Sequence, residues 1–299
     1  MKINILGGGP AGLYFAILMK KLDPAHEIAV VERDGPDDTF GWGVVFSETT
    51  LDNFAQQDRE TYEEFVRHSQ MRDFVVVKHK GETIRIGGNP IAGVARLKWL
   101  QILHGRCRGL GVNLRFHTNV ANVADYLNCD LLVGADGANS LVRKTYEAFF
   151  LPSIEVRQNK FIWLGTEQSF DGLTMSFKQA EAGLFISHSY RFSPTHSTFI
   201  IECPPETWLK AGFDKMPDDQ TCAYLAEVFK DDLGGRPLLS NNFVRWVNFP
   251  LIRNRRWYHQ NVVLLGDALH TAHFSIGSGT KLAMEDSIAL TDCFARCGT

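Results

Sequence analysis

A glycine-rich turn near the N-terminus has the spacing Gly-x-Gly-x-x-Gly and contains Gly7, Gly9, Pro10, Ala11 and Gly12. A pyrophosphate can approach the backbone closely at a glycine such as Gly9, and the N–H groups of a following helix attract its negative charge. Glu32 lies about 20 residues beyond the turn, at the distance where a carboxylate binds an adenosine ribose, and Arg33 follows it. The pattern predicts a dinucleotide site; the alternative is a plain tight turn between a strand and a helix.

Two further pairs of glycine and aspartate each follow a short apolar run: Asp136-Gly137 after 130–134, and Gly266-Asp267 after 261–265. A helix is predicted after each pair. Ligands of α/β proteins bind at the carboxyl ends of parallel strands, so we expect both pairs to join the first glycine turn in one nucleotide site. Taken alone, the Asp136 turn also fits a simple strand–helix connection in which an aspartate caps the helix.

Arg96 and the segment 41–46 are candidates for contact with the same ligand. Arg96 lies in the first turn of a predicted helix over 95–110, where a cation opposes the helix dipole unless it contacts a phosphate. A surface arginine is the alternative. The segment 41–46 places Gly41 and Gly43 around a tryptophan, which suits a chain that passes close to a flat ligand. A simple hairpin or a core aromatic residue would explain the segment equally well.

His270 and His273 lie three residues apart, a spacing that two metal ligands on one helix face would have. A zinc site needs three or four ligands, and no third ligand is obvious nearby, so we predict no metal.

The elements that must position these residues follow two patterns. Before residue 152 and after residue 250, short apolar strands alternate with helices, which is typical of a parallel sheet. From about residue 153, runs rich in Phe, Ile, Trp and Thr are divided by turns, which is typical of an antiparallel sheet. We expect strands over 160–166, 172–178, 183–191, 197–203 and Phe243–Phe249, and a hairpin over 74–86.

These patterns predict an α/β protein with a Rossmann-like nucleotide domain and an inserted, mainly antiparallel β-sheet domain. The nucleotide domain is discontinuous and takes residues 1–70, 93–152 and 250–299, while the inserted domain takes 71–92 and 153–249.

Bulk properties exclude several other classes of protein. The net charge is −3 over 299 residues, so no basic field favours a nucleic acid or an anionic membrane as partner. The first strand is predicted from residue 2, which leaves no room for a signal peptide, and no apolar run approaches the roughly 18 residues of a membrane span. The six cysteines are scattered without a Cys-x-x-Cys motif. We expect reduced thiols in a cytoplasmic protein.

Three motifs in this order resemble the fingerprints of the FAD-dependent aromatic hydroxylases of the para-hydroxybenzoate hydroxylase type, the class A flavoprotein monooxygenases. They are the N-terminal glycine turn, Asp136-Gly137 and Gly266-Asp267. The resemblance spans Lys2 to about Leu290. Within the family, the chain is similar to the branch that holds salicylyl-CoA and 2-aminobenzoyl-CoA hydroxylases and the violacein-pathway hydroxylase. The segments that carry this closer similarity are 41–46, 163–166, 197–203 and 273–280.

The resemblance implies an enzyme that uses FAD, NADH or NADPH, and O2 to hydroxylate a small aromatic substrate through a flavin hydroperoxide. An aryl-CoA thioester and an indolic compound are the candidate substrates. In the family's pattern Glu32 faces the ribose, Arg96 the phosphates and Asp267 the ribityl chain. The residues implied to bind the cofactor are Gly7, Gly9, Pro10, Ala11, Gly12, Glu32, Arg33, Gly43, Val44, Arg96, Asp136, Gly137, Gly266, Asp267, Gly277, Gly279 and Thr280.

Residues from the antiparallel sheet and from the loop over 273–279, called the late loop below, are implied to line the substrate side. They are Phe46, Trp163, His188, Tyr190, His273, Phe274 and Ser275. His188, Tyr190, His273 and Phe274 are the catalytic candidates, with His188 as the proton handler because histidine is the residue type best suited to exchange protons near neutral pH. A packed, hydrogen-bonded histidine on a strand is the alternative.

Two features of the chain depart from the family pattern. His273 and Phe274 stand where most members have prolines, a change shared by the branch named above. Family members continue beyond the point that corresponds to Thr299, so we expect a fragment or the first module of a longer polypeptide. The alternatives to a hydroxylase are an FAD-dependent reductase or oxidase without oxygen insertion, and an inactive flavin-binding module.

Overall fold

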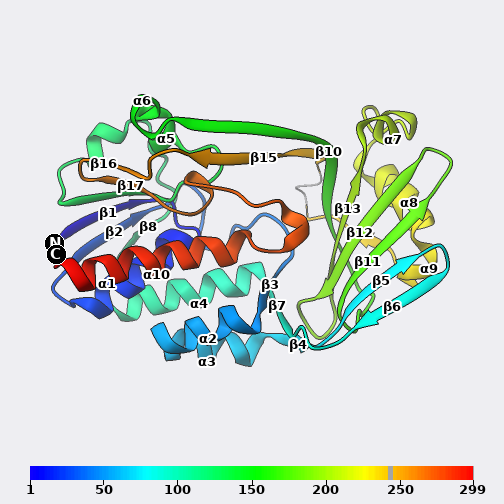
Figure 1. Cartoon of the computed structure of the whole chain (residues 1–299), viewed down its shortest axis with the longest axis horizontal. Coiled ribbons are helices and arrows are strands. Elements are labelled where there is room, and N and C mark those ends of the chain that lie inside the picture. The colour runs from blue at the N-terminus through cyan, green and yellow to red at the C-terminus, as the bar shows by residue number, and fades with distance from the viewer. Residues whose placement is uncertain (242–244, 299) are drawn as a thin grey trace.

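The computed structural model describes residues 1–241 and 245–298, and within these ranges the chain forms three sheets (Figure 1). The apolar runs that precede the glycine turns form sheet A, which has six strands in the order β16-β17-β9-β1-β2-β8. All neighbours are parallel except β16 and β17. The strands are β1 (Lys2–Leu6), β2 (Glu27–Val31), β8 (Asn113–Arg115), β9 (Leu131–Gly134), β16 (Tyr258–His259) and β17 (Val262–Leu264).

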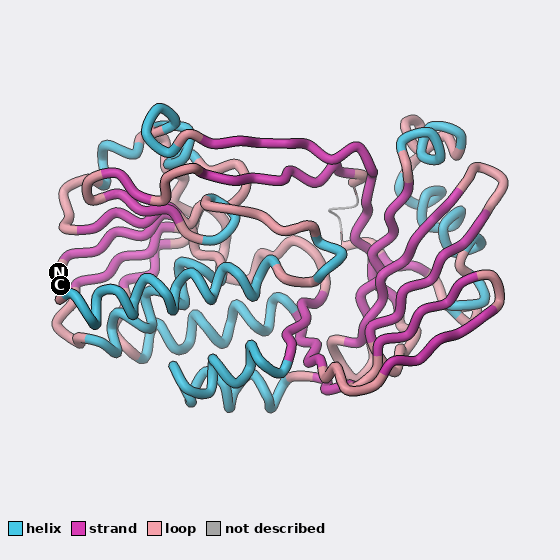
Figure 2. Tube along the Cα trace, in the orientation of Figure 1, coloured by secondary structure: helices cyan, strands magenta, loops and turns pink. Residues whose placement is uncertain are grey.

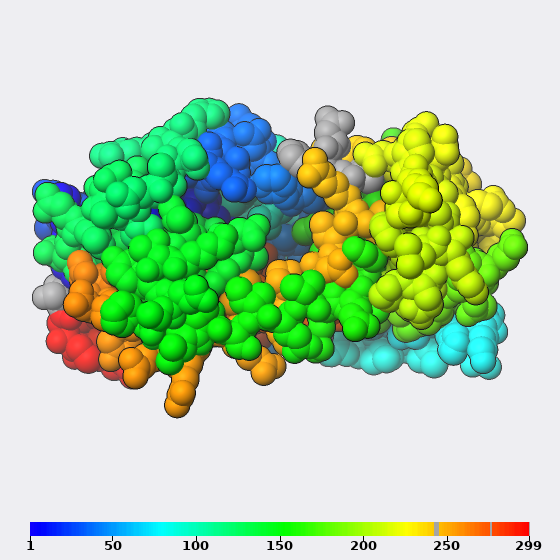
Figure 3. All heavy atoms as spheres, turned by 90° about the horizontal axis from the view of Figure 1, so that it is seen from above, coloured from blue at the N-terminus to red at the C-terminus, as the bar shows by residue number. Residues whose placement is uncertain are grey.

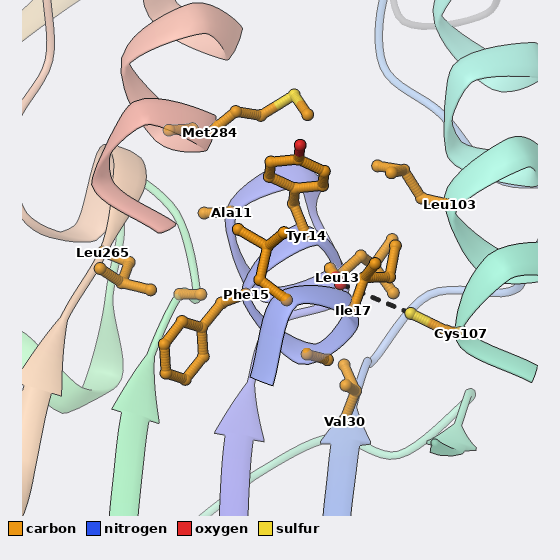
Figure 4. Close-up of a cluster of buried hydrophobic side chains, with 14 of the residues drawn as sticks. Ala11, Leu13, Tyr14, Phe15, Ile17, Val30, Leu103, Cys107, Leu265 and Met284 are labelled. Atoms are coloured by element: carbon orange, nitrogen blue, oxygen red, sulfur yellow. Dashed lines mark hydrogen bonds between the residues drawn. The ribbon is translucent and has the colours of Figure 1, made fainter. Parts of the chain in front are cut away.

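Helix α1 (Pro10–Leu22) occupies the centre of one face of sheet A. Pro10 starts it with a preset backbone angle, and Lys20 and Lys21 complement the dipole in its last turn. Every residue from Ala11 to Met19 is buried, because sheet A lies beneath the helix and two longer helices flank it. Figure 4 shows these neighbours, α4 (Arg96–Gly109) and α10 (Gly279–Cys297), on either side of α1.

Short helices cover the opposite face of sheet A and enclose a second, smaller core around Leu132 and Phe150. They are η1 (Val123–Tyr126), α5 (Leu141–Thr145) and α6 (Glu147–Phe150). Sheet A is thus covered by helices on both faces, as expected for a Rossmann-like unit.

Sheet C holds the remaining long strands and stands apart from sheet A (Figure 2). Its main path runs β14-β10-β13-β12-β11-β5-β6, and β15 also pairs with β10. The strands are β5 (Val75–His79), β6 (Glu82–Ile86), β10 (Pro152–Thr166), β11 (Leu173–Gln179), β12 (Leu184–Arg191), β13 (Ser197–Cys203), β14 (Leu238–Leu239) and β15 (Val247–Asn254). The neighbours are antiparallel except β5 and β11, so the sheet is mainly antiparallel as predicted.

One face of sheet C carries three helices over its own hydrophobic core: α7 (Pro205–Lys210), α8 (Asp218–Val228) and α9 (Lys230–Leu233). Strand β13 shows how the sequence divides the two faces. Phe199 and Ile201 lie in this core, and the alternate residues Ile200 and Glu202 point to the other side.

A small sheet B joins the two larger units. It consists of β3 (Gly43–Ser47), β7 (Ile91–Ala95) and β4 (Gln70–Arg72), in the order β3-β7-β4. The segment around Trp42 is therefore a strand over most of its length, despite its glycines. Helices α2 (Glu48–Gln57) and α3 (Arg59–His68) follow β3.

Strand β10 begins at Pro152, earlier than the strand expected from residue 160. Its first half pairs only with β15, and the two strands form a ribbon that crosses between sheets A and C (Figure 1). Figure 3 shows this ribbon on the surface, in green and orange. Of the strand expected over Phe243–Phe249, the part before residue 245 lies outside the described residues. Within the described ranges, no helix is long and apolar enough to cross a bilayer.

Candidate functional site

The strand ends of sheet A bring the three motifs together. In the parallel register, Leu6 lies opposite both Val31 and Gly134, and Gly134 lies opposite Leu264. The next residues along each strand therefore leave the sheet side by side. Backbone hydrogen bonds continue the alignment past the strand ends, from Ala135 N to Leu6 O (2.8 Å) and from Leu265 N to Gly134 O (2.9 Å).

The glycine turn has the two properties that a pyrophosphate site requires. Gly7 has a φ of +108°, and a Cβ there would lie 2.2 Å from the carbonyl oxygen of Ala135, so only glycine fits. A Cβ at Gly9 would meet no described protein atom within 4 Å, because Gly9 borders an open cleft of about 310 Å³. The backbone of α1 is thus open to a ligand at the point where its free N–H groups lie.

Glu32 lies in the same cleft, and its carboxylate holds the turn in place. One oxygen accepts a hydrogen bond from Gly8 N (2.6 Å) and the other from Asp34 N (3.0 Å). Each oxygen keeps a second lone pair for a ribose hydroxyl. Arg33 also lines the cleft, although its side chain is largely exposed and bonds Asp34.

Arg96 is a second cation that lines the cleft. It is the first residue of α4, and its backbone N–H donates to Trp42 O (2.9 Å). Its Nε is buried and has no hydrogen-bond partner among the described residues, and burial lowers the pKa of the guanidinium although Asp267 opposes this effect. A partly buried cation whose Nε lacks an acceptor, next to the glycine turn, fits a diphosphate group, which would supply that acceptor.

Asp136 lines the cleft but is already engaged within its own loop. One carboxylate oxygen accepts from the N–H groups of Leu141 (2.7 Å) and Val142 (3.1 Å), and the other accepts from Ser140 Oγ (2.5 Å). Asp136 therefore caps the start of α5 and fixes the loop that carries Gly137. Its direct contact with a cofactor stays a prediction.

Arg143 is a site residue that the sequence analysis missed. Its side chain is buried, and it donates to Ala268 O (2.9 Å) and to Ala138 O. It thereby joins the loop of the second motif to the short helix η2 (Gly266–Ala268) of the third. No spacing rule connects an arginine with a carbonyl more than one hundred residues away.

The third motif is tied to the last helix by a second missed pair. Asp286 on α10 accepts a hydrogen bond from Gly266 N (2.9 Å) and contacts His270 Nε2 (2.9 and 3.0 Å). The hydrogen bond to Asp286 raises the pKa of His270. A Cβ on Gly266 would lie 2.9 Å from the Cβ of Ala11, so the motif packs directly on α1. Asp267 lies at this turn as an exposed residue, near enough to Arg96 for the two opposite charges to attract.

The start of α10 faces sheet B. Gly277 has a φ of +63°, and a Cβ there would lie 3.2 Å from the side chain of Val45. Gly279 opens the helix and Thr280 follows it. This loop and β3 therefore approach each other, as expected if both border the flavin ring.

Three predicted residues of β3 have structural contacts. Gly43 N donates to the hydroxyl of Thr198 (3.0 Å), and Val44 is buried. Phe46 is 1% exposed and makes edge contacts with Phe65 and Trp99 in the core around α1. Its ring lies away from the open cleft, and its contact with a substrate stays a prediction.

The face of sheet C turned toward η3 (Phe274–Ile276) carries the other substrate-side candidates. Trp163 lies against Gly41, and its Nε1 is buried with no partner in the described part of the chain. Tyr190 is buried, and its hydroxyl donates to Gly43 O (2.7 Å), so it links sheet C to sheet B. Their roles toward a substrate stay predictions.

The late loop closes on this face through aromatic contacts. Phe274 packs against Phe161 with the ring centres 4.3 Å apart and meets His188 edge-on at 5.8 Å. His273 contacts Phe249, and its Nδ1 hydrogen-bonds Ser275 Oγ (2.8 Å). The structure thus brings His188, His273 and Phe274 together, and their roles in catalysis stay predictions. In the part of the chain that the structure describes, no group of three or more His, Cys, Asp or Glu could hold a metal ion.

Comparisons with known proteins agree with this geometry. The family described as FAD binding domain matches residues 1–297. Salicyloyl-CoA 5-hydroxylase of Streptomyces sp is 44% identical over 98% of this chain and 58% of that protein. Protodeoxyviolaceinate monooxygenase of Chromobacterium violaceum is 35% identical over 95% of this chain and 77% of that protein.

A solved structure of 2-methyl-3-hydroxypyridine-5-carboxylic acid oxygenase has the same fold, with a TM-score of 0.83 at 18% identity. The match covers 100% of this chain and 83% of the other. The chain spans 58% of the length of its salicyloyl-CoA-hydroxylating relative. The family model matches nearly the whole chain, and the fold and the cleft agree with that match. The chain therefore belongs to the FAD-binding monooxygenase family.

Proposed function

We propose that this chain is the FAD-binding and substrate-facing part of an aromatic hydroxylase. The reaction inserts one oxygen atom of O2 into an aromatic ring and takes its electrons from NADH or NADPH. One observation carries the proposal: the cleft at the aligned strand ends holds Arg96, whose Nε is buried and lacks a partner among the described residues, beside the open backbone of Gly9. A dinucleotide diphosphate supplies what both groups lack.

Different residues around the cleft would bind different parts of FAD. Gly9 and the start of α1 would hold the diphosphate together with Arg96, and Glu32 would hold the adenosine ribose. Asp267 would hold the ribityl chain, and the start of α10 would border the flavin ring, where its positive dipole end favours negative charge. Bound FAD supplies the hydride acceptance and the oxygen activation that no amino-acid side chain offers.

The sheet C face supplies the substrate side. Trp163, His188 and Phe274 form an apolar, aromatic surface on which a planar ring would stack, and the late loop would exclude water from it. We propose an aryl-CoA thioester as the substrate class, because one relative carries salicyloyl-CoA in its name; an indolic compound is the alternative. A further part of the proposal is the division into an FAD-binding domain (1–70, 93–152, 250–299) and a substrate domain (71–92, 153–249). The six free thiols support a cytoplasmic location.

The test has two stages. The purified chain should bind FAD with a quenched flavin fluorescence and a one-to-one stoichiometry, and Arg96→Met should weaken this binding. The FAD-loaded protein should then oxidise NADH or NADPH faster with salicyloyl-CoA than without it, and the product should carry label from 18-O2. A protein that binds no FAD would overturn the proposal. Unlabelled product would favour a reductase or an oxidase instead, and FAD binding without turnover would favour a binding module.

A further inference from the structure

The sheet C face that meets the late loop carries an acid that the proposed function does not use. On β13, Glu202 lies opposite Phe161 of β10 and Ile186 of β12. Ile200, two residues earlier, lies opposite His188. Because alternate residues of a strand share a face, Glu202 and His188 are diagonal neighbours on the same side of the sheet.

Glu202 and His188 form a nearly buried pair. Their exposed fractions are 7% and 5%, and Nε2 of His188 lies 3.7 Å from a carboxylate oxygen of Glu202. The other carboxylate oxygen accepts a hydrogen bond from the side-chain amide of Asn159 (2.8 Å). Among the described residues, Nε2 of His188 has no hydrogen-bond partner, because 3.7 Å to Glu202 is too long for one. The amide thus fixes the carboxylate, and the carboxylate faces the imidazole.

The charge of Glu202 has no ordinary counter-ion. In the described ranges, no lysine or arginine side chain lies within 4.0 Å of its carboxylate. Burial alone raises the pKa of Glu202, but His188, Asn159 and His273 together lower it below its usual value. The positive charge of Arg157, which pairs with Glu155, lowers the pKa of His273 at the edge of the cluster. A buried carboxylate costs stability unless it is paired, and here imidazoles are its partners.

The walls of the cluster are aromatic. Phe274 meets His188 edge-on, with the ring planes 85° apart, and also contacts Phe161 and Phe249. A carboxylate that is held by an amide and faces an imidazole, next to an aromatic surface, provides the groups that general base catalysis uses.

We propose that His188 accepts the proton of a ring hydroxyl on the aromatic substrate, and that Glu202 is the positioning residue that orients the imidazole. The inference rests on the proposed function and names the substrate class as a hydroxylated aromatic ring. In the step, the O–H bond of the substrate breaks, a new N–H bond forms on His188, and the electron pair stays on the ring oxygen. Glu202 stabilises the imidazolium that results. The phenolate is richer in electrons and is the better target for oxygen insertion.

The matched variants are Glu202→Gln and, as control, Glu206→Gln. The control makes the same change a few residues beyond the end of β13, at an exposed position. Both variants should keep wild-type FAD binding. With salicyloyl-CoA at pH 7, Glu202→Gln should lower kcat for hydroxylation by about 10- to 100-fold, as the loss of an orienting partner does, and leave KM within about threefold. His188→Gln should lower kcat by about 10²- to 10⁴-fold.

The dependence on pH separates positioning from a merely structural role. As the pH rises, more of the substrate hydroxyl ionises in solution, so the ratio of wild-type kcat to Glu202→Gln kcat should fall toward one. A ratio that stays constant with pH, or an effect equal to that of the control, would overturn the proposal. Asn159→Ala keeps the charge of Glu202 and removes only the hydrogen bond from the Asn159 amide. This variant should lose less kcat than Glu202→Gln and show the same dependence on pH.

A binding measurement keeps the test independent of turnover. The wild-type protein loaded with FAD but without NADH should raise the phenolate band of bound 4-nitrophenol at pH 6, and Glu202→Gln should not. If the wild type hydroxylates nothing, the proposed function fails, yet a phenolate band that depends on Glu202 still supports proton transfer at this cluster. Equal bands in the two proteins would refute it.

Discussion

The substitution Asp58→Asn should cost more stability than any change on the surface of the chain. Asp58 lies between α2 and α3 and is 1% exposed. Its carboxylate accepts hydrogen bonds from Arg106 of α4 (3.0 Å to each oxygen), from Lys21 of α1 (2.9 Å) and from Thr61 (2.6 Å). These bonds join the helix that follows the glycine turn to the helix that begins at Arg96. Their loss would loosen both sides of the cofactor cleft.

The magnitude follows from the ionisation of Asp58. Burial by itself raises the pKa, but the bonds from Arg106, Thr61 and Lys21 lower it from 3.8 to about 2. A shift of this size corresponds to about 2 kcal/mol of stability. The folded pKa lies below the unfolded one, so this stability is present above pH 3.8 and is lost as the pH falls through about 2. The neutral amide introduced by Asp58→Asn would also leave Arg106, which is half-buried, with Glu60 as its remaining ionic partner, so we expect a total loss of about 2 to 4 kcal/mol at pH 7.

Urea unfolding measures this difference directly. The free energy of unfolding should be compared at pH 7 and at several values down to pH 2.5, for the wild type, Asp58→Asn and Glu63→Gln. Glu63 is the matched control, because it forms an exposed pair with Arg59 that should be worth less than about 0.5 kcal/mol. The gap between wild type and Asp58→Asn should narrow toward low pH. A gap below about 0.5 kcal/mol at pH 7, or one that does not change with pH, would refute the reasoning.

Three further predictions concern the cleft. Gly9→Val should leave the unfolding temperature nearly unchanged, because no described protein atom is near, and should weaken FAD binding by at least about 100-fold. Gly7→Val should instead prevent stable folding, because a side chain there would clash with Ala135. Similar stabilities of the two variants would count against this explanation. Arg96→Met should weaken FAD binding by about 10- to 100-fold in a fluorescence titration and flatten its salt dependence, whereas unchanged affinity would mean that the cation does not meet the diphosphate. Asp286 raises the pKa of His270, so this pair contributes its full stability below pH 6.5 and loses it as the pH rises through the pKa of His270 in the folded protein. The difference in unfolding free energy between wild type and His270→Gln should therefore be larger at pH 6 than at pH 9.

Much of the nucleotide cleft could be predicted from the sequence, because its motifs are local. A glycine turn, a strand before it and a helix after it specify one geometry, and parallel strands end at the same edge of their sheet. The alignment of Gly134 with Leu6 and Leu264 therefore followed from recognising three apolar runs. The mainly antiparallel sheet also followed from the spacing of its turns.

The contacts that hold the motifs together could not be predicted in this way. Arg143 bonds a backbone carbonyl of Ala268, and Asp286 bonds a backbone N–H of Gly266, so neither partner leaves a trace in residue type or spacing. His188 lies within the strand that the sequence predicts over 183–191. Its pairing with Glu202 depends on the register between two strands, which only the structure supplies.

The early start of β10 was hidden for a different reason. Residues 153–157 alternate polar and apolar side chains as a strand does, but all five are exposed, so no buried apolar run marks the strand. Pairing with β15 makes them a strand nonetheless.

The ribbon of β10 and β15 also sets how the two units can move. Two hydrogen-bonded strands resist stretching along their length more than they resist bending. A change in the angle between sheets A and C would therefore bend this ribbon rather than lengthen it. The ladder of the two strands is interrupted between Val156 and Lys160, where the register shifts. Any change in the angle between the units would concentrate its bend at this break, a few residues from the Phe161 ring that borders the late loop.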